Sequence, residues 1–157
     1  MNSEIQLLLQ MIDEAFEKKA WHGANLKGSI RGITAEQALW RAKRNRHNIA
    51  EIIIHCAYWK YIVRRRITGK ERGSFPLKGS NWIQRNSPYS EKKLKEDITL
   101  LKQTHKELRK AIAFMNPKEL EKFPKGSTFT NRTTLYGIAQ HDVYHAGQIQ
   151  LLKRLME

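Results

Sequence analysis

Two histidines near the end of the sequence have the spacing of a paired metal site. His141 and His145 are four residues apart, and residues at this spacing lie on the same face of a helix. Apolar residues continue that face in steps of three and four; they are Ile138, Leu152 and Leu155. The pattern predicts that both imidazoles point into a helical core, where burial is costly unless their nitrogens find partners. One divalent metal ion would serve both rings.

A third histidine lies in the middle of another apolar helical segment. His55 is flanked by Ile54 and Cys56, so we expect it to be buried, and helical bundles build metal sites from side chains on facing helices. We therefore predict that His55 joins the first pair around one ion. The residues alone leave an alternative open, in which all three are core histidines bonded to backbone carbonyls or tyrosines. His47 is excluded as a further ligand because it lies roughly 12 Å before His55 along a helix.

Other residues are candidates for the surroundings of the ion. Gln148 shares the inward face one turn after the histidine pair, and it is a candidate for orienting water or substrate. Trp59 and His22 are assigned to the lining of a substrate pocket, with core packing and a loop hydrogen bond as the respective alternatives. No general base is evident, so the catalytic residues stay unassigned.

Three more polar residues are explained structurally. His105 falls on the inward stripe of a predicted helix, and we interpret it as a residue at the boundary of the core, with a role beside the metal ligands as the alternative. Asn48 and Glu51 have the spacing of a capping box, in which each side chain satisfies a backbone N–H at the start of a helix. This interpretation accounts for Glu51 without a ligand role.

Helical periodicity defines the expected fold, and no segment shows a convincing strand alternation. Four long segments and one short segment have apolar residues at helical spacing: residues 5–19, 48–69, 90–117 and 132–157, and the short segment 35–42. Residues 69–89 contain glycines and prolines and predict a long connection, of a length that is often functional. The sequence therefore predicts an all-α four-helix bundle in a single domain over residues 1–157.

The composition favours a protein without a membrane or secretory segment. The longest apolar run is far shorter than a membrane span, and residues 1–19 do not have the pattern of a signal peptide. The single cysteine excludes an internal disulfide framework and fits a cytoplasmic location. The net charge of +14 suggests nucleic acid as a partner. The basic residues are nevertheless spread through every segment, which favours a solvated basic surface.

Three stretches of the chain resemble the DinB-like (YfiT-like) metalloenzyme family. They are WHGAN at 21–25, RHNIAEIIIHCAYWKYIVRRRITG at 46–69 and LYGIAQHDVYHAGQIQLLKRL at 135–155. The resemblance covers essentially the whole chain. It implies a bundle with up-down-down-up connectivity, a homodimer, and zinc or nickel bound by one histidine of the second long helix and two of the fourth. The matching positions here are His55, His141 and His145.

Three protein ligands leave at least one coordination position for water or substrate, as in catalytic metal sites. We therefore expect a metal-dependent enzyme with a small-molecule substrate. A hydrolase would use the ion to lower the pKa of water, and an S-transferase would use it to hold a low-molecular-weight thiol as thiolate. The second option rests on analogy with relatives of the fold. Two alternatives are a non-catalytic metal-binding bundle and a basic nucleic-acid-binding protein.

Overall fold

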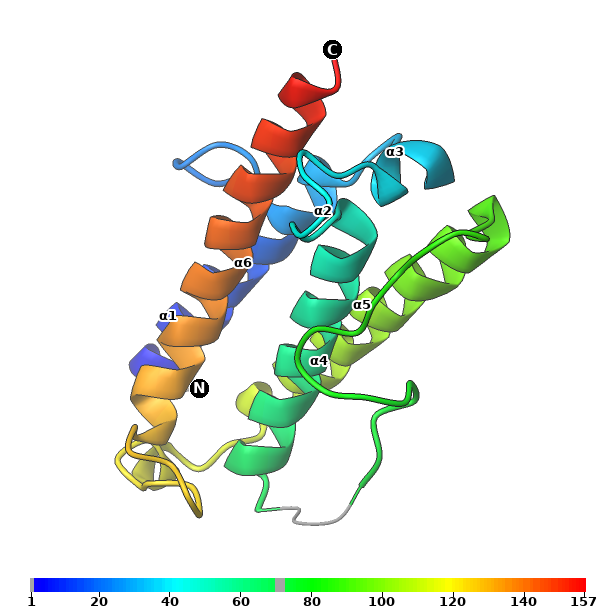
Figure 1. Cartoon of the computed structure of the whole chain (residues 1–157). Coiled ribbons are helices and arrows are strands. Elements are labelled where there is room, and N and C mark those ends of the chain that lie inside the picture. Colours follow the sequence, from blue (N-terminus) through cyan, green and yellow to red (C-terminus); the bar gives the residue numbers. More distant parts are fainter. Residues whose placement is uncertain (1, 70–72) are drawn as a thin grey trace.

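The structure, a computed structural model, describes residues 2–69 and 73–157, and its regular elements in that part of the chain are helices (Figure 1). The long helices are α1 (Ser3–Phe16), α4 (Ile49–Ile67), α5 (Glu91–Ala113) and α6 (Asn131–Leu155). The connections contain α2 (Leu26–Ser29), α3 (Ala35–Leu39) and the 3-10 turn η1 (Pro117–Glu119). Apart from one isolated bridge between Ala20 and Gly23, the described residues form no β-structure. None of the described helices is long and apolar enough to cross a membrane.

The four long helices form a bundle in which two neighbours run parallel. In Figure 1, α1 and α6 run upward, whereas α4 and α5 both run downward. The connection from α4 to α5 must therefore return along the bundle, and its described part, residues 73–90, follows α4 in the opposite direction. This is the up-down-down-up connectivity that the resemblance implied, and the prediction of an all-α four-helix bundle is confirmed.

Capping side chains set where the helices begin. Asn48 accepts the N–H of Glu51 at 2.8 Å at the start of α4, and Ser90 accepts an N–H in the same way at the start of α5. Thr34 makes a complete capping box with Gln37 at α3. Each of these residues satisfies a backbone donor that has no partner within the helix. These three starts agree with the predicted ones.

Three helix ends differ from the prediction by three residues or more. α3 ends at Leu39 and not at Ala42. α1 ends at Phe16 and not at Lys19, because the carbonyl of Asp13 accepts the N–H groups of both Glu17 and Lys18 and so closes the last turn. α5 ends at Ala113 and not at Pro117. Pro117 instead begins η1, where its missing N–H has no cost.

A layer of buried polar side chains separates two apolar clusters. One cluster surrounds the first half of α4 and the second half of α6, and includes Ile53 and Ile149; the other lies at the opposite end and includes Val63 and Leu135. The residues of the layer between them are Asp13, Lys60, Thr104, His105 and Asp142. His105 is 3 % exposed and stacks on Phe16 at 3.7 Å, so our interpretation of it as a boundary residue is wrong.

An ion pair inside this layer joins α4 to α6. Lys60 and Asp142 are fully buried and hydrogen-bonded to each other. Burial raises the pKa of the Asp142 carboxyl above its ordinary value, and Lys60 opposes that effect. A buried charge that loses its partner is strongly destabilising. The pair therefore fixes the register of α4 against α6 one turn away from His55 and directly beside His141.

We expect Lys60→Met to lower the free energy of unfolding by about 3–5 kcal/mol, because it leaves the Asp142 carboxyl buried without its partner. The double variant Lys60→Met/Asp142→Leu should recover most of this loss, since neither charge is then buried. Lys122→Met serves as the control, because Lys122 pairs with Glu119 at the surface, where an ion pair contributes about 1 kcal/mol or less. Urea unfolding followed by circular dichroism measures all three. Equal stability of Lys60→Met and wild type would contradict a stabilising role of the buried ion pair between Lys60 and Asp142.

Candidate metal centre

The three predicted histidines converge at one point between α4 and α6. His141 and His145 lie one turn apart on α6, and His55 faces them from α4. The Nε2 atom of His141 is 3.0 Å from Nε2 of His55 and 3.1 Å from Nε2 of His145. Ligand nitrogens around a tetrahedral zinc ion with Zn–N distances of 2.0–2.1 Å are roughly 3.3 Å apart. The spacing of the imidazoles therefore fits a shared divalent ion.

Hydrogen bonds behind the rings determine which nitrogens face the centre. Nδ1 of His55 lies 3.2 Å from the carbonyl oxygen of Asn81. A carbonyl can only accept, so Nδ1 carries the proton and Nε2 has a lone pair. Nδ1 of His145 lies 2.7 Å from Oε1 of Gln148, whose amide group donates to the hydroxyl of Tyr144. His145 is thereby placed in the same tautomer.

A count of protons shows that the cluster lacks a positive partner. His141 can offer at most one N–H at Nε2, yet that atom faces the lone pairs of both other rings. If His141 instead carries its proton on Nδ1, three lone pairs meet, and the buried Nδ1 has no hydrogen-bond partner among the described residues. One cation at the centre satisfies all three nitrogens. The donor set is thus chemically suited to a metal ion.

The environment keeps these imidazoles neutral. Burial, with a smaller effect of the charge on His145, lowers the pKa of His55 from 6.5 to about 4. Burial and the two neighbouring histidines lower the pKa of His141 to about 3, and burial also lowers the pKa of His145. Only a neutral imidazole can bind a metal ion through its lone pair. The site therefore holds its ligands in the binding form at neutral pH.

Trp82 forms the wall behind His55. Its indole stacks on the His55 ring at 3.8 Å with an interplanar angle of 6° and, on the other face, on the His47 ring at 3.7 Å and 5°. His47 is thus separated from the cluster by Trp82, in agreement with its exclusion as a ligand. Asn81, the residue before Trp82, has a positive φ of 54°, a conformation that asparagine tolerates better than most residues. The long connection was singled out as functional in general, but neither residue was predicted.

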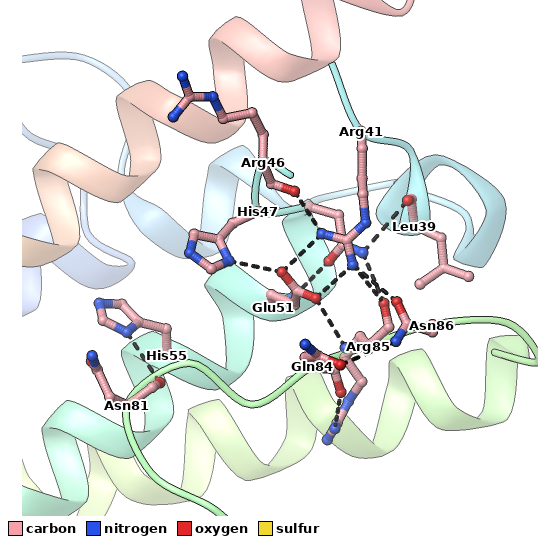
Figure 2. A network of polar contacts seen from close by, with 11 residues as sticks. Leu39, Arg41, Arg46, His47, Glu51, His55, Asn81, Gln84, Arg85 and Asn86 are labelled. Carbon is pink, nitrogen blue, oxygen red and sulfur yellow. Dashed lines mark hydrogen bonds and ion pairs between the residues drawn. The ribbon is translucent and has the colours of Figure 1, made fainter. Parts of the chain in front are cut away.

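Glu51 supports this wall rather than capping α4. Figure 2 shows its carboxylate between His47, the guanidinium of Arg41 and the backbone N–H of Arg85. The Arg41 pair is bidentate, with N···O distances of 2.6 and 3.0 Å. These hydrogen bonds outweigh burial and lower the pKa of Glu51 to about 2. The capping-box interpretation is therefore half wrong, since Asn48 caps the helix but Glu51 does not return the bond.

A second group of potential ligands overlaps the cluster but suits a metal ion less well. Cys56, His141 and Asp142 have ligand atoms within 4.8 Å of one another. However, the Asp142 carboxylate is bonded to Lys60, and burial raises the pKa of the Cys56 thiol well above its ordinary value. A protonated thiol is a poor ligand. Cys56 is instead a buried member of the apolar cluster around the first half of α4.

The remaining predicted residues lie at different distances from the cluster. Gln148 contacts His145 directly, as described above. Trp59 lines a hollow of about 470 Å³ that also contains His141, and its indole N–H donates to the side chain of Asn81 at 2.9 Å. His22 lines a separate hollow of about 280 Å³ between α1 and α6. The assignment of Trp59 and His22 to a substrate pocket stays a prediction.

The fold and the cluster define a class of protein: an all-α bundle that presents three histidines, two buried and one half-buried, from two antiparallel helices. A family model described as the DinB superfamily matches residues 20–149, and the chain belongs to that superfamily. A search of curated proteins and a search of solved structures each gave no match. The matched range contains all three histidines and the connection with Asn81 and Trp82.

The neutral histidines predict how the stability of the metal-free protein depends on pH. An unfolded chain takes up protons on these residues near pH 6.5, whereas the folded chain does so only near pH 4 for His55 and pH 3 for His141 and His105. The unfolded state binds more protons in this window, so stability must fall as the pH is lowered from about 6.5.

We expect the melting temperature, measured in the presence of a chelator, to be several degrees lower at pH 5 than at pH 7.5. His141→Gln removes one of the titrating groups and should reduce the dependence of unfolding free energy on pH by about one proton. A melting temperature that is equal at both pH values would show that the imidazoles are not held neutral.

Proposed function

We propose that this protein is a metal-dependent enzyme in which His55, His141 and His145 bind one zinc or nickel ion, and that it is a hydrolase or a thiol-dependent S-transferase. The observation that carries the proposal is the convergence of three Nε2 atoms, two of which have free lone pairs because Nδ1–H of His55 donates to Asn81 and Nδ1–H of His145 donates to Gln148. An ion bound there would act as a Lewis acid, which activates water for hydrolysis or stabilises the thiolate of a low-molecular-weight thiol.

The ligand count supports a catalytic site over a closed structural site. Within residues 2–69 and 73–157, no fourth histidine, cysteine or carboxylate joins the group formed by the three histidines. Structural zinc sites usually have four protein ligands, whereas catalytic sites have three and an open position. The hollow that contains His141 gives a substrate access to that position.

The residues around the ligands would contribute by orienting and shielding them. Asn81 and Gln148 direct the lone pairs of His55 and His145 toward the ion. Trp82 covers one face of His55 and limits the access of water from the side of His47. Partners that orient metal-binding histidines in this way strengthen binding and fix the ring orientation.

Purified wild-type protein should contain about one zinc or nickel ion per chain by elemental analysis, because three neutral imidazoles form a sufficient ligand set. The variants His55→Gln, His141→Gln and His145→Gln should each lose the metal ion. His22→Gln is the matched control, since His22 lies in the separate hollow described above, and it should keep the ion. Loss of metal in only one of the three variants would mean that the site is misplaced.

A screen of ester and thiol substrates then separates the two reaction classes. Turnover should require the ion and should be absent from the three histidine variants. If the metal is bound but all activity is independent of it, the non-catalytic metal-binding alternative is correct.

Titration with DNA and RNA at rising salt tests the alternative that the net charge serves nucleic-acid binding, since contacts with phosphates weaken as the salt concentration increases.

Removal of the Gln148 amide should weaken metal binding without unfolding the protein. We expect Gln148→Ala to lower the affinity for zinc by about 10–100-fold, because Nδ1 of His145 loses its acceptor. Gln150→Ala on the same helix is the control and should have wild-type affinity. Competition with a chromophoric chelator measures both. An unchanged affinity in Gln148→Ala would show that the amide does not orient the ligand.

A further inference from the structure

A groove between α4 and α6 extends away from the histidine cluster. Its volume is about 470 Å³. On α4 the groove follows Trp59, Val63 and Arg66, and on α6 it follows His141, Gly137 and neighbouring residues. Arg66 follows Trp59 by seven positions, which corresponds to about 10 Å along the helix axis. The groove therefore runs from a candidate metal ligand toward the turn of α4 that carries Arg66.

Most of the groove is apolar or aromatic, and a single side chain carries its charge. The lining residues other than those named above are Phe129, Thr133, Thr134, Tyr136, Ile138 and Gln140. Arg66 is the only residue of the lining with a permanent charge. Its guanidinium lies over the ring of Trp59, 5.9 Å from the ring centre.

The charge of Arg66 has no carboxylate partner among the described residues. The nearby Arg64, by contrast, pairs with Glu107 at 3.1 Å. An arginine that is held over an aromatic ring in an apolar groove is a suitable partner for a carboxylate, because the guanidinium offers two parallel N–H donors.

Gly137 keeps the middle of the groove open. Glycine in the interior of a helix costs stability, and at this position a Cβ atom would meet no heavy atom within 4 Å. Close packing therefore does not require the glycine. Gly147, on the same helix but outside the groove, also has open space at its Cβ position, so the two positions can be compared directly.

We propose that this groove selects substrates with an apolar body and a carboxylate at one end. The carboxylate binds Arg66, the body lies over Gly137 and against Trp59, and the opposite end reaches His141. This inference rests on the proposed function for the reaction at the histidine cluster, but the binding of the carboxylate to Arg66 does not require the ion.

The test compares octanoate with octanamide, a neutral molecule of the same length, by calorimetry on the full-length chain. Wild type should bind octanoate at least about tenfold more tightly, as a charge-assisted hydrogen-bonded pair predicts. Arg66→Gln should abolish this preference, and Arg66→Lys should retain part of it. Gly137→Leu should weaken the binding of both molecules, whereas the matched variant Gly147→Leu should change neither.

Each titration is carried out on metal-loaded protein and on protein treated with chelator. A preference for octanoate that needs Arg66 and persists without metal supports the groove even if the proposed metal site fails. A preference that survives in Arg66→Gln, or equal affinity for both molecules in wild type, overturns the inference. A preference that vanishes with the metal but not with Arg66 also overturns it, and leaves the metal site intact.

Discussion

The arrangement of the site depends on which ring nitrogen of His55 and of His145 carries the proton. Nδ1–H of His55 donates to a backbone carbonyl, and Nδ1–H of His145 donates to a side-chain amide oxygen, so both rings present Nε2 lone pairs to His141. Without these acceptors each ring could rotate or change tautomer, and the three nitrogens would form ordinary hydrogen bonds within the core. The buried layer with Lys60 and Asp142 supports the same geometry, because it fixes the two helices that carry the rings.

Much of the fold followed from periodicity and capping. The four long helices were predicted because their apolar residues repeat at helical spacing, and starts at Asn48 and Ser90 were predicted because their side chains accept backbone N–H groups. The convergence of the three histidines was predicted from the same stripes, since a histidine at an inward position must meet the facing helix. The ends of α1 and α5 were less predictable, because a carbonyl that closes the last turn leaves no mark in the sequence.

The residues that the sequence did not indicate are those whose roles depend on the path of the chain. Trp82 and Asn81 lie in an irregular connection, and no periodicity shows that this segment returns along α4 to reach His55. The partnership of Lys60 with Asp142 is equally hidden, since charged residues are usually placed on the surface. Glu51 was misinterpreted for a related reason. Its spacing from Asn48 suggested a local hydrogen bond, but the carboxylate instead accepts from the side chain of Arg41 and from the backbone N–H of Arg85.

Asn81 joins two functions in one residue. Its main-chain oxygen accepts from the ring of His55, while its side-chain oxygen accepts from the indole of Trp59 in the wall of the groove. The shape of the groove and the orientation of the first imidazole are consequently not independent variables. Redesign of the groove for a bulkier molecule would have to keep the indole N–H of Trp59, or supply another donor, for Asn81 to stay in its left-handed conformation beside His55.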